Sequence, residues 1–319
     1  MRRVHGLEDL SPALFHRPVA AMGVFDGVHR GHAAVLAETA ALADAVGGEP
    51  VAVTFDPHPR VVVEGKGPGT LTSLPHRLRL LARAGAAAAV VLRFDAALRE
   101  RSAEWFLEEV LLARMGIAGL VLGPDLHFGR NRRGDPAMAR AFLEPRGVPV
   151  RSVDRVQGRG GPVSSTAIRE AVRAGDLERA AEMLGRPVSV LGTVVRGDGR
   201  GASIGFPTAN LDLHQKIRPP AGVYAGRASL ADGRRLPCLV NVGGRPTFHP
   251  EAGEETVEAW IPGFAGDLYG QEVEVSFLLR LREERKFTGP EALRAQILRD
   301  HAAMVEWIAR EAGGAAAPE

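Results

Sequence analysis

Apolar runs of five to seven residues alternate with longer amphipathic segments through the first 185 residues of the chain. The short runs predict buried strands at 19–25, 51–55, 89–94, 119–123 and 148–153. The longer segments predict helices at 29–46, 74–84, 103–115, 136–143 and 166–184, the last interrupted near Gly175. Such alternation is typical of a mostly parallel sheet with helices on both faces, in which ligands bind beyond the carboxyl ends of the strands.

The pattern changes after residue 185. Strand-like runs separated by Gly and Pro follow at 189–195, 222–230, 236–243, 256–261 and 272–281, and they predict an antiparallel barrel or sandwich. A final helix begins near Thr288, with an apolar stripe at Leu293, Ile297, His301, Met304 and Ile308. We therefore predict an α/β domain over residues 1–185 and a β domain over residues 186–319, whose last helix packs against the strands.

Composition narrows the class of protein. The chain has 319 residues, of which 45% are hydrophobic. A net charge of +2 and 5% aromatic residues do not favour a nucleic-acid-binding protein. We expect no membrane partner, because no uncharged stretch approaches the ~20 apolar residues of a spanning helix and the N-terminus has no apolar signal segment. The single cysteine, Cys238, excludes an internal disulfide and favours the reducing cytoplasm.

The segment GVFDGVHRGH, residues 23–32, links the first predicted strand to the first predicted helix. A helix N-terminus carries partial positive charge and favours Asp, Asn, Ser or Thr, yet this one has His29, Arg30 and His32. The two histidines are three residues apart and share a helix face, and Gly31 gives a ligand access to the backbone. The pattern predicts a phosphate site. Surface histidines, or a metal site completed by His58, remain alternatives.

A second helix start repeats the anomaly. The segment SSTAIRE offers Ser164, Ser165 and Thr166 as N-caps. With Thr166 as the cap, Arg169 stands at the third helical position, where a capping box has Glu or Gln. Two hydroxyl groups and a guanidinium one turn apart would bind an oligophosphate. An ordinary cap, with Arg169 turned to solvent, is the alternative.

The β domain contains its own candidate site. The segment VVRGDGRGASIGFPTAN, residues 194–210, is Gly-rich but lacks the Gly-Lys-Ser/Thr of a Walker A loop. Thr208 and Asn210 are two residues apart, so in an extended segment both face the same way and offer oxygen ligands suited to Mg²⁺. In TVEAWI, alternation places Glu258 beside Trp260, where a desolvated carboxylate could act as a base. A surface hairpin and a solvent-facing Glu are the alternatives.

Together these motifs resemble a known family. GVFDGVHRGH resembles the His-x-Gly-His motif of the nucleotidyltransferase superfamily, and SSTAIRE resembles its Ser-Ser-Thr partner. With FDPHP, FGRNRRGD and the segment after Leu184, residues 1–308 resemble the prokaryotic bifunctional riboflavin kinase/FMN adenylyltransferases, or FAD synthetases. The resemblance implies a Rossmann-like nucleotidyltransferase domain followed by an antiparallel β-barrel flavokinase domain. It also implies phosphorylation of riboflavin to FMN, then adenylylation of FMN to FAD and pyrophosphate, with ATP and Mg²⁺ used in catalysis.

The resemblance also implies residue roles. In the first domain, His29, His32 and Arg169 would act on the phosphates of ATP. The residues expected to bind that ATP are Gly23, Phe25, Asp26, Gly31, Ser165 and Thr166, and those expected on the FMN side are His58 and Asp125. In the second domain, Glu258 would deprotonate riboflavin, and Thr208 and Asn210 would bind the metal. The remaining kinase residues are Gly197, Gly205, Pro207 and Thr208 for ATP, and Arg282 and Phe287 for the flavin.

The chain departs from the family pattern at three places. Pro162 stands where the family usually has Arg, and Arg155 or Arg159 could replace that cation. His76-Arg77 replaces a usual Glu-Lys, and Ala202 replaces a usual Arg or Lys. Two other functions stay open: an adenylyltransferase whose barrel only binds a ligand, and a basic barrel that binds RNA, which the low aromatic content disfavours. Self-association also stays open.

Overall fold

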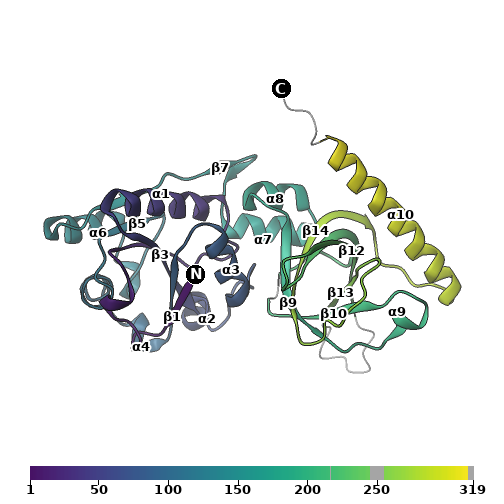
Figure 1. Cartoon of the computed structure of the whole chain (residues 1–319). Coiled ribbons are helices and arrows are strands. Elements are labelled where there is room, and N and C mark those ends of the chain that lie inside the picture. Colours follow the sequence, from purple (N-terminus) through teal and green to yellow (C-terminus); the bar gives the residue numbers. More distant parts are fainter. Residues whose placement is uncertain (216, 245–254, 315–319) are drawn as a thin grey trace. The chain divides into compact units, whose positions relative to one another are not determined.

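The structure is a computed structural model that describes residues 1–215, 217–244 and 255–314. The chain divides into two compact units (Figure 1). Unit 1 comprises residues 1–168 and 182–185, and unit 2 comprises residues 169–181 and 186–319. The two domains predicted from the sequence meet after residue 185, whereas here residues 169–181 group with the second unit.

Unit 1 is built on a parallel sheet of six strands in the order β1-β4-β3-β2-β5-β6. Their bounds are β1 (Arg2–His5), β2 (Pro18–Met22), β3 (Glu49–Asp56), β4 (Ala88–Arg93), β5 (Gly119–Leu122) and β6 (Val150–Ser152). The chain runs outward from β2 to β3 and β4, then returns to β5 on the other side of β2. The order thus reverses beside β2, where ligands bind in sheets of this kind.

Both faces of the sheet are buried, as the alternation of apolar runs and helices predicts. On one face, β2 side chains such as Val19 and Ala21 pack with α1 (Arg30–Val46) and α3 (Leu74–Arg83). On the other face, the alternate β2 residues Ala20 and Met22 pack with η2 (Phe106–Arg114) and α6 (Pro136–Leu143). Because successive side chains of a strand point to opposite faces of the sheet, alternate residues pack into the two cores.

Several elements differ from the prediction. Strand β1 was not predicted, and a short helix, α2 (Pro59–Glu64), occupies a valine-rich stretch. The helix predicted at 103–115 consists of α5 (Ala103–Trp105) and the π-helical η2. The predicted interruption at Gly175, whose φ is 77°, separates α7 (Ser165–Ala174) from α8 (Leu177–Leu184). Shorter helical segments complete the unit: η1 (Pro12–Leu14), α4 (Ala96–Arg99), η3 (Arg130–Arg132) and η4 (Glu144–Arg146). A two-stranded ribbon joins β7 (Gln157–Gly158) to β8 (Gly161–Pro162).

Unit 2 is a closed antiparallel barrel, which decides between the barrel and sandwich alternatives. The strand order is β10-β13-β12-β11-β14-β9, with β9 paired to β10. The bounds are β9 (Val188–Val195), β10 (Thr208–Leu213), β11 (Gly222–Ser229), β12 (Arg235–Gly244), β13 (Glu255–Trp260) and β14 (Glu272–Arg282). The short helix α9 (Arg200–Ser203) precedes β10. Strand β10 adds to the five strands predicted, because the Gly-rich segment continues into the barrel wall.

The C-terminal helix α10 (Pro290–Gly314) covers one side of this barrel (Figure 1). Met304 is buried against Ala225 and Leu239, and Ile297 and Ile308 pack beside it. The ring of His301 meets that of Trp260 at 5.2 Å between centroids. The predicted apolar stripe is therefore the face that packs on the barrel. Within the described residues, none of the helices has the length and apolar character needed to cross a membrane.

Two candidate active sites

The turn after β2 is a compact structure with unusual backbone angles. Phe25, Gly27 and Val28 all have positive φ, at 53°, 85° and 40°. The carboxylate of Asp26, which is 2% exposed, accepts hydrogen bonds from the backbone N–H groups of Leu71 (3.1 Å) and Thr72 (3.0 Å). Non-glycine residues hold positive φ only where the surroundings enforce it, and such strain concentrates at functional sites.

His29 and His32 cap helix α1 for each other. His29 Nδ1 accepts from the backbone N–H of His32, and His32 Nδ1 accepts from the backbone N–H of His29, both at 3.3 Å. The rings stack with centroids 3.6 Å apart. The sequence argument that this helix start breaks the capping rules is therefore wrong, because an imidazole with unprotonated Nδ1 is itself an acceptor.

This capping fixes the position of the remaining proton on each ring. When Nδ1 accepts a hydrogen bond, neutral imidazole carries its proton on Nε2, so both rings keep an Nε2–H donor. Gly31 belongs to this arrangement, since a β-carbon there would lie 3.1 Å from Cε1 of His29. The ring of Phe25 meets His32 edge to face at 5.2 Å, and a β-carbon on Gly23 would lie 3.3 Å from that phenyl ring.

The start of α7 lies beside the same turn. Ser165 Oγ donates to the backbone carbonyl of Asp26 at 2.8 Å, which joins two segments far apart in the sequence. Of the three candidate caps, Ser164 is the one observed, since its Oγ accepts from the N–H of Ala167 at 3.2 Å, so Arg169 does not stand at the third helical position. Thr166 is exposed, and Arg169, one turn along α7, is 6% exposed.

Two other predicted residues follow the strands on either side of β2. His58 lies after β3 and caps α2 through Nδ1, which accepts from the N–H of Arg60 at 3.2 Å. Asp125 lies after β5, is exposed and forms an ion pair with Arg155. Among the described residues, no group of three His, Cys, Asp or Glu side chains could hold a metal ion. This disfavours the alternative of a three-histidine metal site at His29, His32 and His58.

The second candidate site is a pocket of about 700 Å³ in unit 2. Three parts of the unit line it: the Gly-rich segment with β10, the barrel interior, and the segment after β14 with α10. Among the predicted kinase residues, the lining includes Thr208, Asn210, Glu258, Arg282 and Phe287. The structure thus brings together residues separated by up to 79 positions in the sequence.

Strand pairing aligns the polar residues of this pocket. Glu258 pairs with Asn210 of β10 on one side and with Asn241 of β12 on the other. Thr208 Oγ1 donates to Oε2 of Glu258 at 3.3 Å. The sequence correctly places Thr208 and Asn210 on one face. Asn241 was not predicted, although a lone polar residue within the apolar run LPCLVNVG is the signal that could have revealed it.

Two glycines of the Gly-rich segment occupy positions where a side chain would not fit or would strain the backbone. Gly197 lies against the side-chain amide of Asn210, and no β-carbon fits between them. Gly205 has a φ of 88°, which a residue with a side chain rarely adopts. Pro207 follows Phe206, whose ring meets that of Trp260 at 4.9 Å and lines the pocket.

Comparison with known proteins identifies the whole chain. A family model described as FAD synthetase matches residues 12–167, and a model described as riboflavin kinase matches residues 184–308. Over 320 residues, covering both chains completely, this chain is 34% identical to the bifunctional riboflavin kinase/FMN adenylyltransferase of Escherichia coli K12. The chain belongs to the bifunctional riboflavin kinase/FMN adenylyltransferases.

A second curated relative and one solved structure also match nearly the whole chain. The relative from Pseudomonas fluorescens is 37% identical over 310 residues, covering 95% of this chain and 96% of its own length. A solved structure described as a macrolide-efflux protein from Streptococcus pneumoniae has a TM-score of 0.83 and 27% identity, and covers 96% of this chain and 100% of its own. The chain is therefore an ATP-dependent transferase that makes FMN from riboflavin and FAD from FMN. Hypotheses in which the barrel only binds a ligand or binds RNA are excluded by the kinase assignment.

Two of the departures from the family pattern can be examined through the contacts that the residues concerned form. His76 and Arg77 are both buried, at 0% and 1% exposed. Arg77 donates to Thr54 Oγ1 (3.2 Å) and to the carbonyl of Phe55 (3.0 Å), while burial lowers the pKa of its guanidinium. Of the two arginines that could replace a cation at position 162, Arg155 pairs with Asp125, and Arg159 lies 3.9 Å from Glu182.

Proposed function

We propose that the histidine-capped turn is where FMN is adenylylated and that the barrel pocket is where riboflavin is phosphorylated. One observation carries this assignment. The reciprocal cap of His29 and His32 stacks two imidazoles with both Nδ1 atoms accepting from the backbone, which places the proton of each neutral ring on Nε2. Paired fixed donors of this kind suit a phosphate whose negative charge increases during reaction.

In the adenylylation step, an oxygen of the FMN phosphate attacks the α-phosphorus of ATP. A new P–O bond forms, the bond from the α-phosphorus to the bridging oxygen breaks, and pyrophosphate leaves. We assign His29 and His32 to the α-phosphate oxygens, since the reaction needs positioning and charge stabilisation rather than a covalent protein intermediate. Ser165, Thr166 and Arg169 are assigned to the leaving pyrophosphate, and the bond from Ser165 to Asp26 keeps α7 beside the turn.

The same turn would hold the rest of the nucleotide. Gly23, Phe25 and Gly31 pack tightly around the two imidazoles, so we assign them to the walls of the adenylate pocket. Asp26 is buried and bonded to backbone groups, and we assign it to holding the turn rather than to contacting ATP. His58 and Asp125 follow β3 and β5, the strands on either side of β2, and we assign both residues to FMN.

In the kinase step, Glu258 takes the proton of the riboflavin 5′-hydroxyl as that oxygen attacks the γ-phosphorus of ATP. The bond between the γ-phosphorus and the bridging oxygen breaks, and ADP leaves. Glu258 suits this role because it lies in the pocket between Asn210 and Asn241 on the neighbouring strands. The Thr208 hydroxyl donates to the carboxylate and helps to orient it.

The donor set of this pocket fits Mg²⁺. The ion prefers oxygen ligands, keeps several waters and is usually bound through one or two protein groups plus substrate phosphates. Thr208 and Asn210 supply a hydroxyl and an amide oxygen on one face, and Asp198 lines the same pocket. When bound, Mg²⁺ neutralises phosphate charge. Because both reactions use ATP, we place the enzyme in the cytoplasm.

The magnesium requirement of riboflavin phosphorylation tests the kinase assignment. Thr208→Val should raise the Mg²⁺ concentration needed for half-maximal FMN formation by about tenfold or more. Thr193→Val is the matched control, because Thr193 lies on β9 and bonds His214 at 2.9 Å, outside the pocket lining. An unchanged Mg²⁺ requirement in Thr208→Val would contradict the assignment of Thr208 to the metal.

A further inference from the structure

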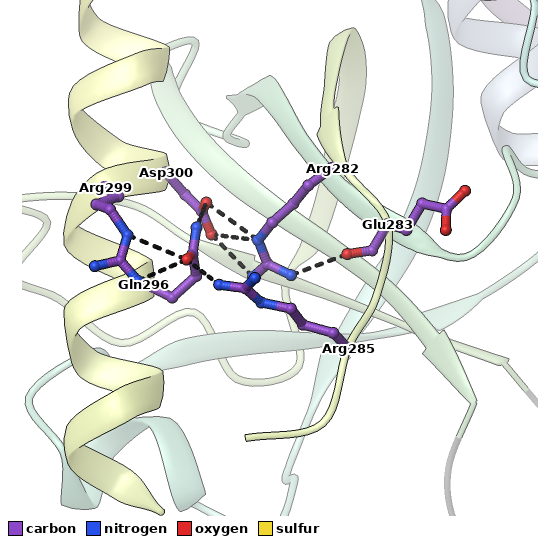
Figure 2. Close-up of polar contacts among 6 residues, drawn as sticks. All are labelled: Arg282, Glu283, Arg285, Gln296, Arg299 and Asp300. Atoms are coloured by element: carbon purple, nitrogen blue, oxygen red, sulfur yellow. Dashed lines mark hydrogen bonds and ion pairs between the residues drawn. The ribbon is translucent and has the colours of Figure 1, made fainter. Parts of the chain in front are cut away.

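Two arginines, Arg282 and Arg285, connect the end of β14 to helix α10 (Figure 2). Arg282 is the last residue of β14, and its Nε lies 3.0 Å and 3.1 Å from the two carboxylate oxygens of Asp300. Its Nη2 lies 2.9 Å from Asp300 Oδ2, and its Nη1 donates to the carbonyl of Glu283 at 3.0 Å. The Asp300 side chain is only 5% exposed. All three guanidinium nitrogens of Arg282 are therefore engaged by the protein.

Gln296 extends the network along the same helix. Its Nε2 donates to Asp300 Oδ1 at 2.6 Å, and its Oε1 accepts from Arg285 and from Arg299, the latter through Nη2 at 2.8 Å. In Figure 2 the side chains of Arg282 and Arg285 both point from the segment after β14 toward Gln296 and Asp300. A buried carboxylate and one amide on α10 thus hold both ends of a short stretch, which we call the strap (residues 282–285).

The strap determines where several pocket residues lie. Glu284, Arg285, Lys286 and Phe287 all line the barrel pocket. The Phe287 ring lies 5.6 Å from the guanidinium carbon of Arg282 and 5.1 Å from that of Arg285. The Glu284 carboxylate lies where a β-carbon on Gly243 would be, directly over β12. Because these contacts depend on the strap, a change at its anchor on α10 would move the pocket wall.

We propose that Asp300 is a positioning residue for riboflavin phosphorylation, which acts through Arg282 to hold the strap and Phe287 against the flavin. The proposal rests on the kinase site proposed above. Phe287, Leu293 and Ile297 give the pocket a flat aromatic and apolar lining that suits the ring system of a flavin. The phosphate-binding groups lie instead on the Gly-rich segment and β10. The expected effect is therefore on riboflavin binding, not on the chemical step.

The test compares full-length variants in steady-state kinase assays at saturating ATP. Asp300→Asn keeps the shape but removes the charge, and it should raise the riboflavin KM about tenfold with kcat within about twofold of the parent. Arg282→Lys keeps the charge but loses the bidentate geometry, and it should do the same. The double variant should match either single variant, because both changes break one contact. Glu306→Gln, at an exposed acid of α10 that is 3.9 Å from Arg310, is the matched control.

Each possible outcome of these assays either supports or overturns the proposed role of Asp300. The proposal is supported if the two single variants and the double variant raise the riboflavin KM by the same factor, and if FMN adenylylation by the same preparations is unchanged. An unchanged KM in Asp300→Asn overturns it, as does multiplication of the two effects, because Arg282 would then act independently of Asp300. An equal rise in the Glu306→Gln control also overturns it. If Asp300→Asn does not fold, Arg282→Lys alone decides through the same split between KM and kcat. Failure of the kinase assignment is distinguishable, since Glu258→Gln would then retain full kinase activity.

Discussion

The hydroxyl of Thr72 and the carboxylate of Asp26 form a buried hydrogen bond of 3.2 Å across 46 positions of sequence. The same hydroxyl accepts from the backbone N–H of Gly27 at 3.0 Å. Thr72 lies just before α3, so this pair ties the turn that carries the two histidines to the start of another helix. Together with the two backbone bonds to the Asp26 carboxylate, these bonds explain how the turn maintains its unusual backbone angles.

Thr72→Val should therefore slow FMN adenylylation, although Thr72 is not among the residues assigned to the phosphates of ATP. Loss of the hydroxyl removes the acceptor of the Gly27 N–H and the donor to Asp26, which costs roughly 1–3 kcal/mol of stability. Because the turn positions two histidines, we expect a fall in the FAD-forming rate of about tenfold or more and unchanged riboflavin phosphorylation. Thr39→Val is the control, since Thr39 is a buried threonine that bonds only within α1, to Val35. An FAD-forming rate that falls equally in both variants would show a general loss of stability instead.

Capping and catalysis by His29 can be separated. His29→Ala removes both the acceptor for the His32 N–H and the Nε2–H donor, so thermal stability and FAD formation should both fall. His29→Asn restores a good N-cap, which is worth about 0.5–2 kcal/mol, but places no donor where Nε2 was. We expect thermal denaturation of the Asn variant close to the parent, with FAD formation still reduced about 10²–10³-fold. Activity near that of the parent in His29→Asn would mean that the imidazole serves only as a cap.

The single cysteine should be inert in the folded enzyme. Cys238 is fully buried in β12, and burial raises the pKa of its thiol to about 12. Since the thiolate is the reactive form, only about one part in 10⁴ is ionised at pH 8. Iodoacetamide should leave both activities intact and label the chain only after denaturation, as mass spectrometry would record. Rapid labelling of the native enzyme would contradict the buried environment.

The sequence predicted most of the architecture because burial dictates periodicity. Strands β2 to β5 are largely apolar runs that alternate with helices, and the shared face of Thr208 and Asn210 is a direct consequence of a two-residue period. Strand β1 was not predicted because RRVH contains only one apolar residue, Val4. The strand lies at the edge of the sheet, where it pairs with β4.

The sites were less predictable, because distant residues set the geometry. Ser164 caps α7 while Ser165 bonds the carbonyl of Asp26, and no local rule reports that distant contact. The mutual cap of His29 and His32 depends on the tautomer of each ring. Asn241 and Asp300 reach the barrel pocket through strand register and helix packing. Those relationships follow from the closed barrel and cannot be deduced from neighbours in sequence.

The two chemistries should also separate in fragments. We predict that residues 186–319 fold and make FMN, but not FAD. A longer fragment, residues 169–319, is the informative comparison, because residues 169–181 group with the barrel unit and Gly175 lies next to Pro220. Both fragments should show a folded circular dichroism spectrum and kinase activity. A folded fragment without kinase activity would show that the first unit contributes residues to the kinase site.

The most direct test of the account is a pair of initial rates measured on His32→Ala and Glu258→Gln, with each half-reaction assayed separately. From FMN and ATP, His32→Ala should form FAD about 10²–10³ times more slowly than the parent, while Glu258→Gln should match the parent. From riboflavin and ATP, Glu258→Gln should form FMN about 10²–10⁴ times more slowly, while His32→Ala should match the parent. This reciprocal pattern is the expected result. Loss of both activities in either correctly folded variant would contradict the assignment of one chemistry to each site.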